Sequence, residues 1–122
     1  MSHDRPELRG ANTPWGRADQ ATEFAPGILF YSTPSHGGFH LNPARMAALN
    51  RRYPGFQTFA GGPWFEEDCD ACIVVVTFPE HFDSVAVESC AKQIRTMATA
   101  SRLNNRSYTR FSAVEAALEA QR

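Results

Sequence analysis

The apolar positions of this chain form short runs separated by prolines and glycines, and the first run predicts a buried strand over residues 24–33. This run consists of Ile28, Leu29, Phe30 and Tyr31. Pro26-Gly27 and Pro34 bound it, and its lack of alternation is typical of a strand that is buried on both faces. Gly37-Gly38 supplies a turn, and residues 39–41 are long enough for a second strand. We therefore expect a small antiparallel sheet.

Capping residues and apolar spacing predict two helices. Asn42 is a common N-cap residue, and Pro43 suits the first helical position because its missing N–H needs no partner there. A helix is therefore expected over residues 43–50. Residues 84–99 place apolar side chains at a spacing close to 3.6, which predicts a second helix with Asp83 as its cap.

The element that follows the proline- and glycine-rich loop at residues 51–63 is ambiguous. The β-branched run at residues 73–76 favours a strand. The consecutive acids at residues 66–68 suit a helix N-terminus, because the macrodipole favours negative charge there. We prefer a helix over residues 66–77, and the strand remains the alternative.

The remaining segments complete an α+β fold. Residues 107–111 alternate like a short edge strand. Ser112 and Glu115 match a capping box, which predicts a terminal helix over residues 113–120. Residues 1–13 are polar, so we expect a disordered or loosely attached leader. The pattern as a whole predicts one compact α+β domain over residues 14–122, in which a small antiparallel sheet packs against two to four helices.

Composition restricts the class of protein. The 122 residues are 43% hydrophobic, which is enough for one core. No stretch approaches the roughly 18–20 apolar residues that span a bilayer, and the first residues lack an apolar signal core. Three cysteines are too few for a disulfide framework, which indicates a reducing compartment. We therefore expect a cytoplasmic protein that does not bind membranes.

The net charge of −1 conceals an uneven distribution of charge along the chain. Residues 53–91 contain no lysine or arginine, and they contain seven acids: Glu66, Glu67, Asp68, Asp70, Glu80, Asp83 and Glu88. An acidic surface attracts a basic protein partner. The alternative is that these acids pair with the basic residues of the two ends of the chain in the folded state.

The turn after the first predicted strand is a candidate site. It contains Ser32, Thr33, Ser35, His36, Gly37 and Gly38. Glycines allow a ligand to approach the backbone closely, so the turn is suited to binding. Ser35 and His36 are candidate catalytic residues, although neighbouring side chains of an extended segment point to opposite faces. The alternative is that Thr33 and Ser35 only make local turn hydrogen bonds, and that His36 is an ordinary exposed imidazole.

A second polar block, Glu66-Glu67-Asp68, follows Trp64 and Phe65. A carboxylate beside these aromatic rings would be partly desolvated, which suits it to acid–base chemistry. We expect His36 and Glu67 to form the central pair of one pocket, with Trp64, Glu66 and Asp68 as binding residues. Beside His36, the Glu67 and Asp68 carboxylates could also hold a divalent metal, although no cofactor is required. The alternative is an acidic first turn of a helix.

Two further motifs carry weaker signals. Cys69, Cys72, His81 and Cys90 are potential zinc ligands, but their spacing does not form two tight pairs, so we prefer buried hydrophobic cysteines. Residues 102–111 carry arginines at every fourth position, interleaved with aromatic side chains. Three such charges would bind nucleic acid only weakly at physiological salt. We therefore expect no direct nucleic-acid binding.

Four blocks of the sequence carry a family resemblance. They are Thr13-Pro14-Trp15-Gly16, Ala25-Pro26-Gly27-Ile28 with the following Ser32-to-Gly38 turn, Trp64-Phe65-Glu66-Glu67-Asp68-Cys69, and Phe78-Pro79-Glu80-His81-Phe82. In order and spacing they resemble an uncharacterised family of small domains encoded by phages, plasmids and other mobile elements, over residues 13–82. The resemblance implies that the two polar blocks belong together. The chain departs from the family pattern at Ala71 and in the β-branched run that follows, and residues 92–122 lie outside the resemblance.

Two functions of different classes follow. The first is a mobile-element protein that acts by binding, for example as an inhibitor of a bacterial defence system such as CRISPR–Cas. It would present the acids of segment 66–88, including Glu80, Asp83 and Glu88, to a basic surface. The second is a small hydrolase or transferase that uses the Ser32-to-Gly38 turn together with the acids at 66–68. The sequence assigns no oligomeric state.

Overall fold

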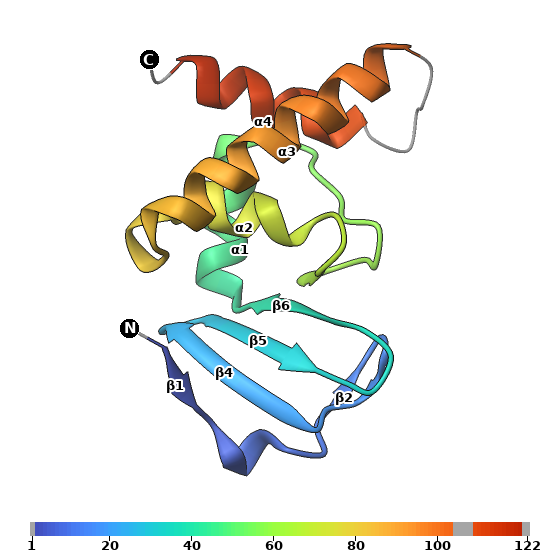
Figure 1. Ribbon diagram of the computed structural model, residues 1–122, viewed down its shortest axis with the longest axis vertical. Helices are drawn as coiled ribbons and strands as arrows, with labels where there is room; N and C mark the ends of the chain where they lie inside the picture. Colours follow the sequence, from blue (N-terminus) through green and yellow to red (C-terminus); the bar gives the residue numbers. More distant parts are fainter. Residues whose placement is uncertain (1, 104–108, 121–122) are drawn as a thin grey trace.

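The computed structural model describes residues 2–103 and 109–120, and these form a sheet with helices stacked on one side of it (Figure 1). The main sheet is antiparallel, with strand order β1-β4-β5-β6-β7. Its strands are β1 (His3–Asp4), β4 (Gln20–Ala25), β5 (Ile28–Ser32), β6 (Gly37–Leu41) and β7 (Trp64–Glu66). A small ribbon pairs β2 (Asn12–Thr13) with β3 (Gly16–Arg17). The predicted α+β class is confirmed.

The helices form two layers above the sheet. They are α1 (Pro43–Arg52), α2 (Ala71–Thr77), α3 (Ser84–Leu103) and α4 (Thr109–Ala120), with short 3₁₀ turns η1 at Pro6–Leu8 and η2 at Pro79–His81. Helices α1 and α2 lie next to the sheet, and α3 and α4 lie beyond them (Figure 1). Among the described residues, no helix combines the length and the apolar character that a membrane crossing requires.

The hairpin β5–β6 matches the predicted pair of strands, but the predicted strand over residues 24–33 is in fact two strands. Pro26-Gly27 is a turn between β4 and β5, and Gly27 adopts a φ of +87°, which favours glycine. Strand β4 was missed because its buried positions, Ala21 and Ala25, are small and give a weak apolar pattern. The expected burial on both faces is also only partial, since Leu29 and Phe30 are half-buried.

Residues 3–4 pair with the main sheet and residues 12–13 pair with β3, whereas a loose leader was expected over this segment. His3 pairs with Glu23 in β4, and the Arg5 N–H donates to the Ala21 carbonyl at 2.9 Å. The Arg5 guanidinium also lies 3.1 Å from the Glu23 carboxylate. Backbone pairing of this kind needs no apolar side chain, so composition alone did not indicate it.

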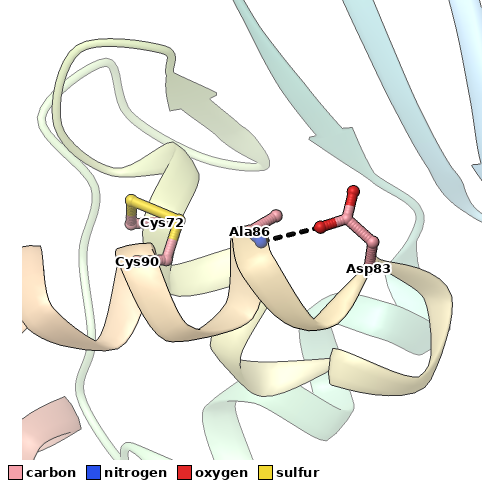
Figure 2. The surroundings of a disulfide bond; sticks show 4 residues. All are labelled: Cys72, Asp83, Ala86 and Cys90. Atoms are coloured by element: carbon pink, nitrogen blue, oxygen red, sulfur yellow. Dashed lines mark hydrogen bonds between the residues drawn. A yellow bond between two sulfur atoms is a disulfide. The ribbon is translucent and has the colours of Figure 1, made fainter.

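The predicted caps of α1 and α3 are confirmed. The Asn42 carboxamide oxygen accepts from the Arg45 N–H at 2.9 Å. The Asp83 carboxylate accepts from the Ala86 N–H at 2.8 Å, as Figure 2 shows. Both helices extend beyond their predicted ends, to Arg52 and to Leu103.

The C-terminal prediction is partly wrong. Helix α4 begins at Thr109, so Ser112 and Glu115 lie inside it and do not form a capping box at its start. Of the predicted edge strand, residues 107–108 lie outside the described residues and residues 109–111 are helical. Phe111 and Val114 are fully buried, and this separation of three residues defines one face of a helix.

Residues 66–77 are not one helix. Residues 64–66 form β7, because Phe65 is fully buried and pairs with Phe39 in β6. The acids at 66–68 therefore end a strand and enter a turn, and α2 begins at Ala71. The β-branched run at 73–76 is helical and buried on every side, so burial overrides its strand propensity.

Candidate functional site

The β5–β6 turn is closed by its own hydroxyl groups. The Thr33 hydroxyl donates to the His36 carbonyl at 2.6 Å, and the His36 N–H donates back to the Thr33 hydroxyl at 3.1 Å. The Ser35 hydroxyl donates to the Trp15 carbonyl at 3.3 Å. Thr33 and Ser35 therefore make the local hydrogen bonds that were the structural alternative, and Ser32 lies half-buried in β5.

Strand pairing brings the second polar block beside this turn. Glu66 pairs with Gly38, and the Glu67 N–H donates to the Gly37 carbonyl at 2.9 Å. As a result, the His36 Nδ1 atom lies 3.8 Å from an Asp68 carboxylate oxygen. Ligand atoms of His36, Glu67 and Asp68 all lie within 4.8 Å of one another. We call these three residues the His36 cluster.

The His36 cluster is on the surface. All three residues are exposed, with the side chains of His36 and Asp68 at 50% and 69% exposure. The desolvation that was expected from Trp64 and Phe65 therefore does not reach Glu67 or Asp68. The close contact of His36 is with Asp68, whereas Glu67 was the expected central partner. The cluster is open to solvent and can accept a ligand from outside.

Glu66 leaves the cluster and contacts the N-terminal segment. Its carboxylate accepts from the Trp15 indole N–H at 3.3 Å. Trp15 also packs edge-on against Trp64, with 5.7 Å between the ring centroids. Glu66 and Trp64 thus hold the loop that carries Trp15. The Trp15 carbonyl then accepts from the Ser35 hydroxyl and so fixes the β5–β6 turn.

The two glycines of the turn serve the packing of the protein itself. A Cβ atom on Gly38 would overlap the Phe65 carbonyl and the Trp15 ring. A Cβ atom on Gly37 would lie 2.7 Å from the Tyr31 carbonyl oxygen, well inside contact distance. Glycine is therefore required for the close approach of β6 to its neighbours, whether or not a ligand binds.

His40 is a polar residue of this region that the motif analysis passed over. It lies in β6 on the face opposite the main core, with its ring 4.7 Å from that of Trp64 and 6.4 Å from that of Tyr31. Burial lowers the pKa of its imidazole, because the charged form loses water. In the sequence, His40 lies between the apolar residues Phe39 and Leu41, and this alternation indicated that its side chain is on the opposite face of the strand.

The acidic segment 66–88 does not present seven acids on one surface. Asp70 is fully buried and forms an ion pair with Arg110. Glu80 and Asp83 are exposed beside an aromatic cavity, while Glu88 lies on α3 near Lys92. The segment passes through a strand, a turn and two helices, so neighbours in sequence separate in space.

The cysteines also differ from expectation. Cys72 in α2 and Cys90 in α3 form a disulfide (Figure 2), whereas the cysteine count predicted none. Helices α2 and α3 pack against each other and bring the two cysteines together, and the spacing of the cysteines in the sequence did not reveal this. Cys69 is free and half-buried, and burial, followed by the charge of Asp70, raises the pKa of its thiol. The disulfide removes two of the four potential zinc ligands.

The fold and the site define an α+β domain in which helices cover one face of an antiparallel sheet and a histidine–carboxylate cluster occupies one hairpin. Residues 8–117 match the model of a family described as Domain of unknown function (DUF7007), and the chain belongs to this family. The match extends beyond residues 13–82, over which the resemblance was expected, and it includes most of residues 92–122, which were expected to lie outside the family. Comparison with curated proteins found no match, and comparison with solved structures found none either.

Proposed function

We propose that the His36 cluster binds a divalent cation, and that this cation is the group through which the protein engages an anionic ligand or a water molecule. The observation that carries the proposal is the separation of no more than 4.8 Å between the ligand atoms of His36, Glu67 and Asp68. One imidazole with two carboxylates suits Zn²⁺ or Mn²⁺. The residues come from two segments that backbone pairing holds together, and their exposed side chains can close around an ion.

Three protein ligands leave coordination positions open. In sites of this type the open position takes water or a substrate oxygen, which supports the hydrolase or transferase hypothesis. Ser35 has no nucleophilic role in this proposal, because its hydroxyl donates to the Trp15 carbonyl. Thr33 and the two glycines are positioning residues that shape the turn bearing His36.

Calorimetric titration of the chain with ZnCl₂ and MnCl₂ tests the proposal. We expect one cation per chain, and at least about tenfold weaker binding after His36→Ala or Asp68→Asn. The matched control is His3→Ala, which removes an exposed histidine from β1 at the other edge of the sheet. Equal affinity of His36→Ala and the parent chain for both metals would refute the proposal.

A second candidate is the binding of a basic protein partner. It is supported by the exposed carboxylates of Glu80 and Asp83 and by the absence of lysine and arginine from residues 53–91. In this proposal the chain is a mobile-element protein that inhibits a defence complex such as CRISPR–Cas. Asp70 plays no part in it, because that carboxylate is buried.

Association with a purified CRISPR–Cas effector at rising salt tests the second candidate. Electrostatic binding weakens steeply as salt rises. Simultaneous charge reversal of Glu80, Asp83 and Glu88 should slow association, because steering depends on net local charge. Charge reversal of Asp4, which is exposed on β1, is the control. Affinity that is indifferent to salt and to the triple reversal would exclude this electrostatic mode.

A further inference from the structure

An aromatic cavity of about 620 Å³ lies between the sheet and the start of α3. Four phenylalanines line it: Phe24, Phe30, Phe39 and Phe82. The rings of Phe24 and Phe82 stack at 5.1 Å, and Phe39 meets them edge-on at 5.6 and 5.7 Å. A volume of this size is typical of small-molecule sites. The three strands β4, β5 and β6 each contribute one ring, so the sheet holds the cavity open.

The charged groups beside the rings are acidic. Glu80 and Asp83 line the cavity and are exposed, and no lysine or arginine is among its described lining residues. One oxygen of Asp83 accepts from the Ala86 N–H (Figure 2), which leaves the other oxygen able to accept from a ligand. The Glu80 carboxylate lies 3.5 Å from the His81 Nε2 atom.

Arg45 contacts the lining residue His81, but other groups of the protein engage its guanidinium. The Arg45 Nη2 atom lies 3.4 Å from the His81 Nε2 atom, but its Nε donates to the Pro26 carbonyl at 3.0 Å. Its guanidinium also lies over the Phe78 ring at 5.0 Å. Arg45 is not among the described residues that line the cavity.

We propose that this cavity binds a small organic ammonium ion, with an apolar body against the phenylalanines and a cationic head at Glu80 and Asp83. Aromatic faces attract cations and apolar groups alike. The two carboxylates favour positive charge and disfavour carboxylate or phosphate ligands. This site shares no residue with the His36 cluster, so the inference stands apart from the metal proposal.

The test compares three probes that differ only in the polar group. 2-Phenylethylammonium, 2-phenylethanol and 3-phenylpropanoate are titrated separately into the full chain and followed by NMR chemical shifts. We expect the ammonium ion to bind at least about tenfold more tightly than the alcohol, and the carboxylate to bind most weakly. Equal binding of the ammonium ion and the alcohol, or no binding of the ammonium ion at millimolar concentration, overturns the proposal.

Variants then assign the binding to this cavity. The double variant Glu80→Gln, Asp83→Asn should lose the preference for the ammonium ion and stay folded, because asparagine is also a good N-cap. Asp19→Asn removes an exposed carboxylate outside the cavity and should leave binding unchanged. Ala86→Phe should fill the cavity and weaken all three probes. A preference that survives the double variant places binding elsewhere and refutes the assignment.

Nα-Acetyl-lysine amide distinguishes a free amine from a protein side chain. It carries the same ammonium group on a peptide-like unit, and the proposal expects it to bind more weakly than 2-phenylethylammonium because it has no aromatic ring to pack on Phe24 and Phe82. Tighter binding of the lysine derivative would overturn the choice of a free small molecule in favour of a basic side chain of a protein.

Discussion

Asp70 provides the sharpest test of the structure, because it is a charged residue with no exposed surface. Its carboxylate accepts from the Arg110 guanidinium and from the Phe59 N–H, the latter at 2.8 Å. Arg110 is in α4, and Phe59 is in the loop that follows α1. A single buried carboxylate thus joins three segments, and Asp70→Ala removes all of these contacts at once.

The expected loss follows from the burial of both partners. The Arg110 side chain is only 12% exposed, so water cannot replace the missing carboxylate. Removal of one partner of a buried ion pair costs about 3–5 kcal/mol, out of a total stability of about 5–15 kcal/mol for a domain. For a chain of this length each kcal/mol lowers Tm by about 3–5 °C, so we expect a fall of about 10–25 °C.

Urea and thermal unfolding of Asp70→Ala, Arg110→Met and the double variant provide the measurement. The double variant should cost less than the sum of the two single changes, because both remove the same interaction. Asp4→Ala is the control, since its pair with Arg9 is exposed and surface pairs contribute little. If Asp70→Ala is no more destabilised than Asp4→Ala, the buried pair does not hold α4 in place.

Three further predictions concern stability. Reduction of the Cys72–Cys90 disulfide, whose cysteines are 18 residues apart, should destabilise the folded chain by about 3 kcal/mol, because the unfolded chain gains entropy. The control Cys69→Ser should not destabilise it. Unfolding with and without dithiothreitol measures the effect, and an identical midpoint would contradict the prediction. Gly38→Ala should cost about 1–3 kcal/mol, since its Cβ would overlap the Phe65 carbonyl; unaltered urea unfolding would show that β6 can shift. Burial lowers the pKa of His40, so as the pH drops the unfolded chain binds a proton at a higher pH than the folded chain does, and the free energy of unfolding should fall through about pH 6.5. His40→Gln should reduce this dependence of stability on pH. An unchanged dependence would assign it to other groups.

The elements that local sequence predicted are those whose signals lie within a few residues. Helix α1 begins with Asn42 and Pro43, and α3 begins after Asp83, because a capping side chain bonds to a backbone N–H only three residues away. The β5–β6 hairpin is equally local. Each of these predictions depends on stereochemistry that operates before the rest of the chain is folded.

The elements that were missed depend on distant partners. Strand β7 forms because β6 supplies an edge for it to pair with, and the paired residues Phe39 and Phe65 are 26 positions apart in the sequence. Without that edge, Glu66 to Asp68 resemble a helix start. Strand β1 depends in the same way on β4. The Cys72–Cys90 disulfide requires α2 and α3 to be packed together. Local propensity cannot report such long-range pairing.

The candidate site shows the same division. Spacing alone did not show that Asp68 rather than Glu67 makes the close contact with His36, because that contact depends on the turn that follows β7. The expected desolvation failed for a related reason: Phe65 points into the core while the next exposed acids point out. Nothing in the sequence indicated the aromatic cavity, because its phenylalanines come from β4, β5, β6 and the segment before α3.

One short acidic segment therefore has three separate roles. Glu66 binds Trp15, Glu67 and Asp68 face His36, and Asp70 is buried against Arg110. Because Glu66 and Asp70 are held by the protein on either side, the backbone between them has little freedom to move Glu67 and Asp68 away from His36. Two carboxylates kept this close repel each other, and a bound divalent cation relieves that repulsion. Metal binding should accordingly stabilise the folded chain in proportion to its affinity, so the rise of Tm with metal concentration reports on the same site as the titration.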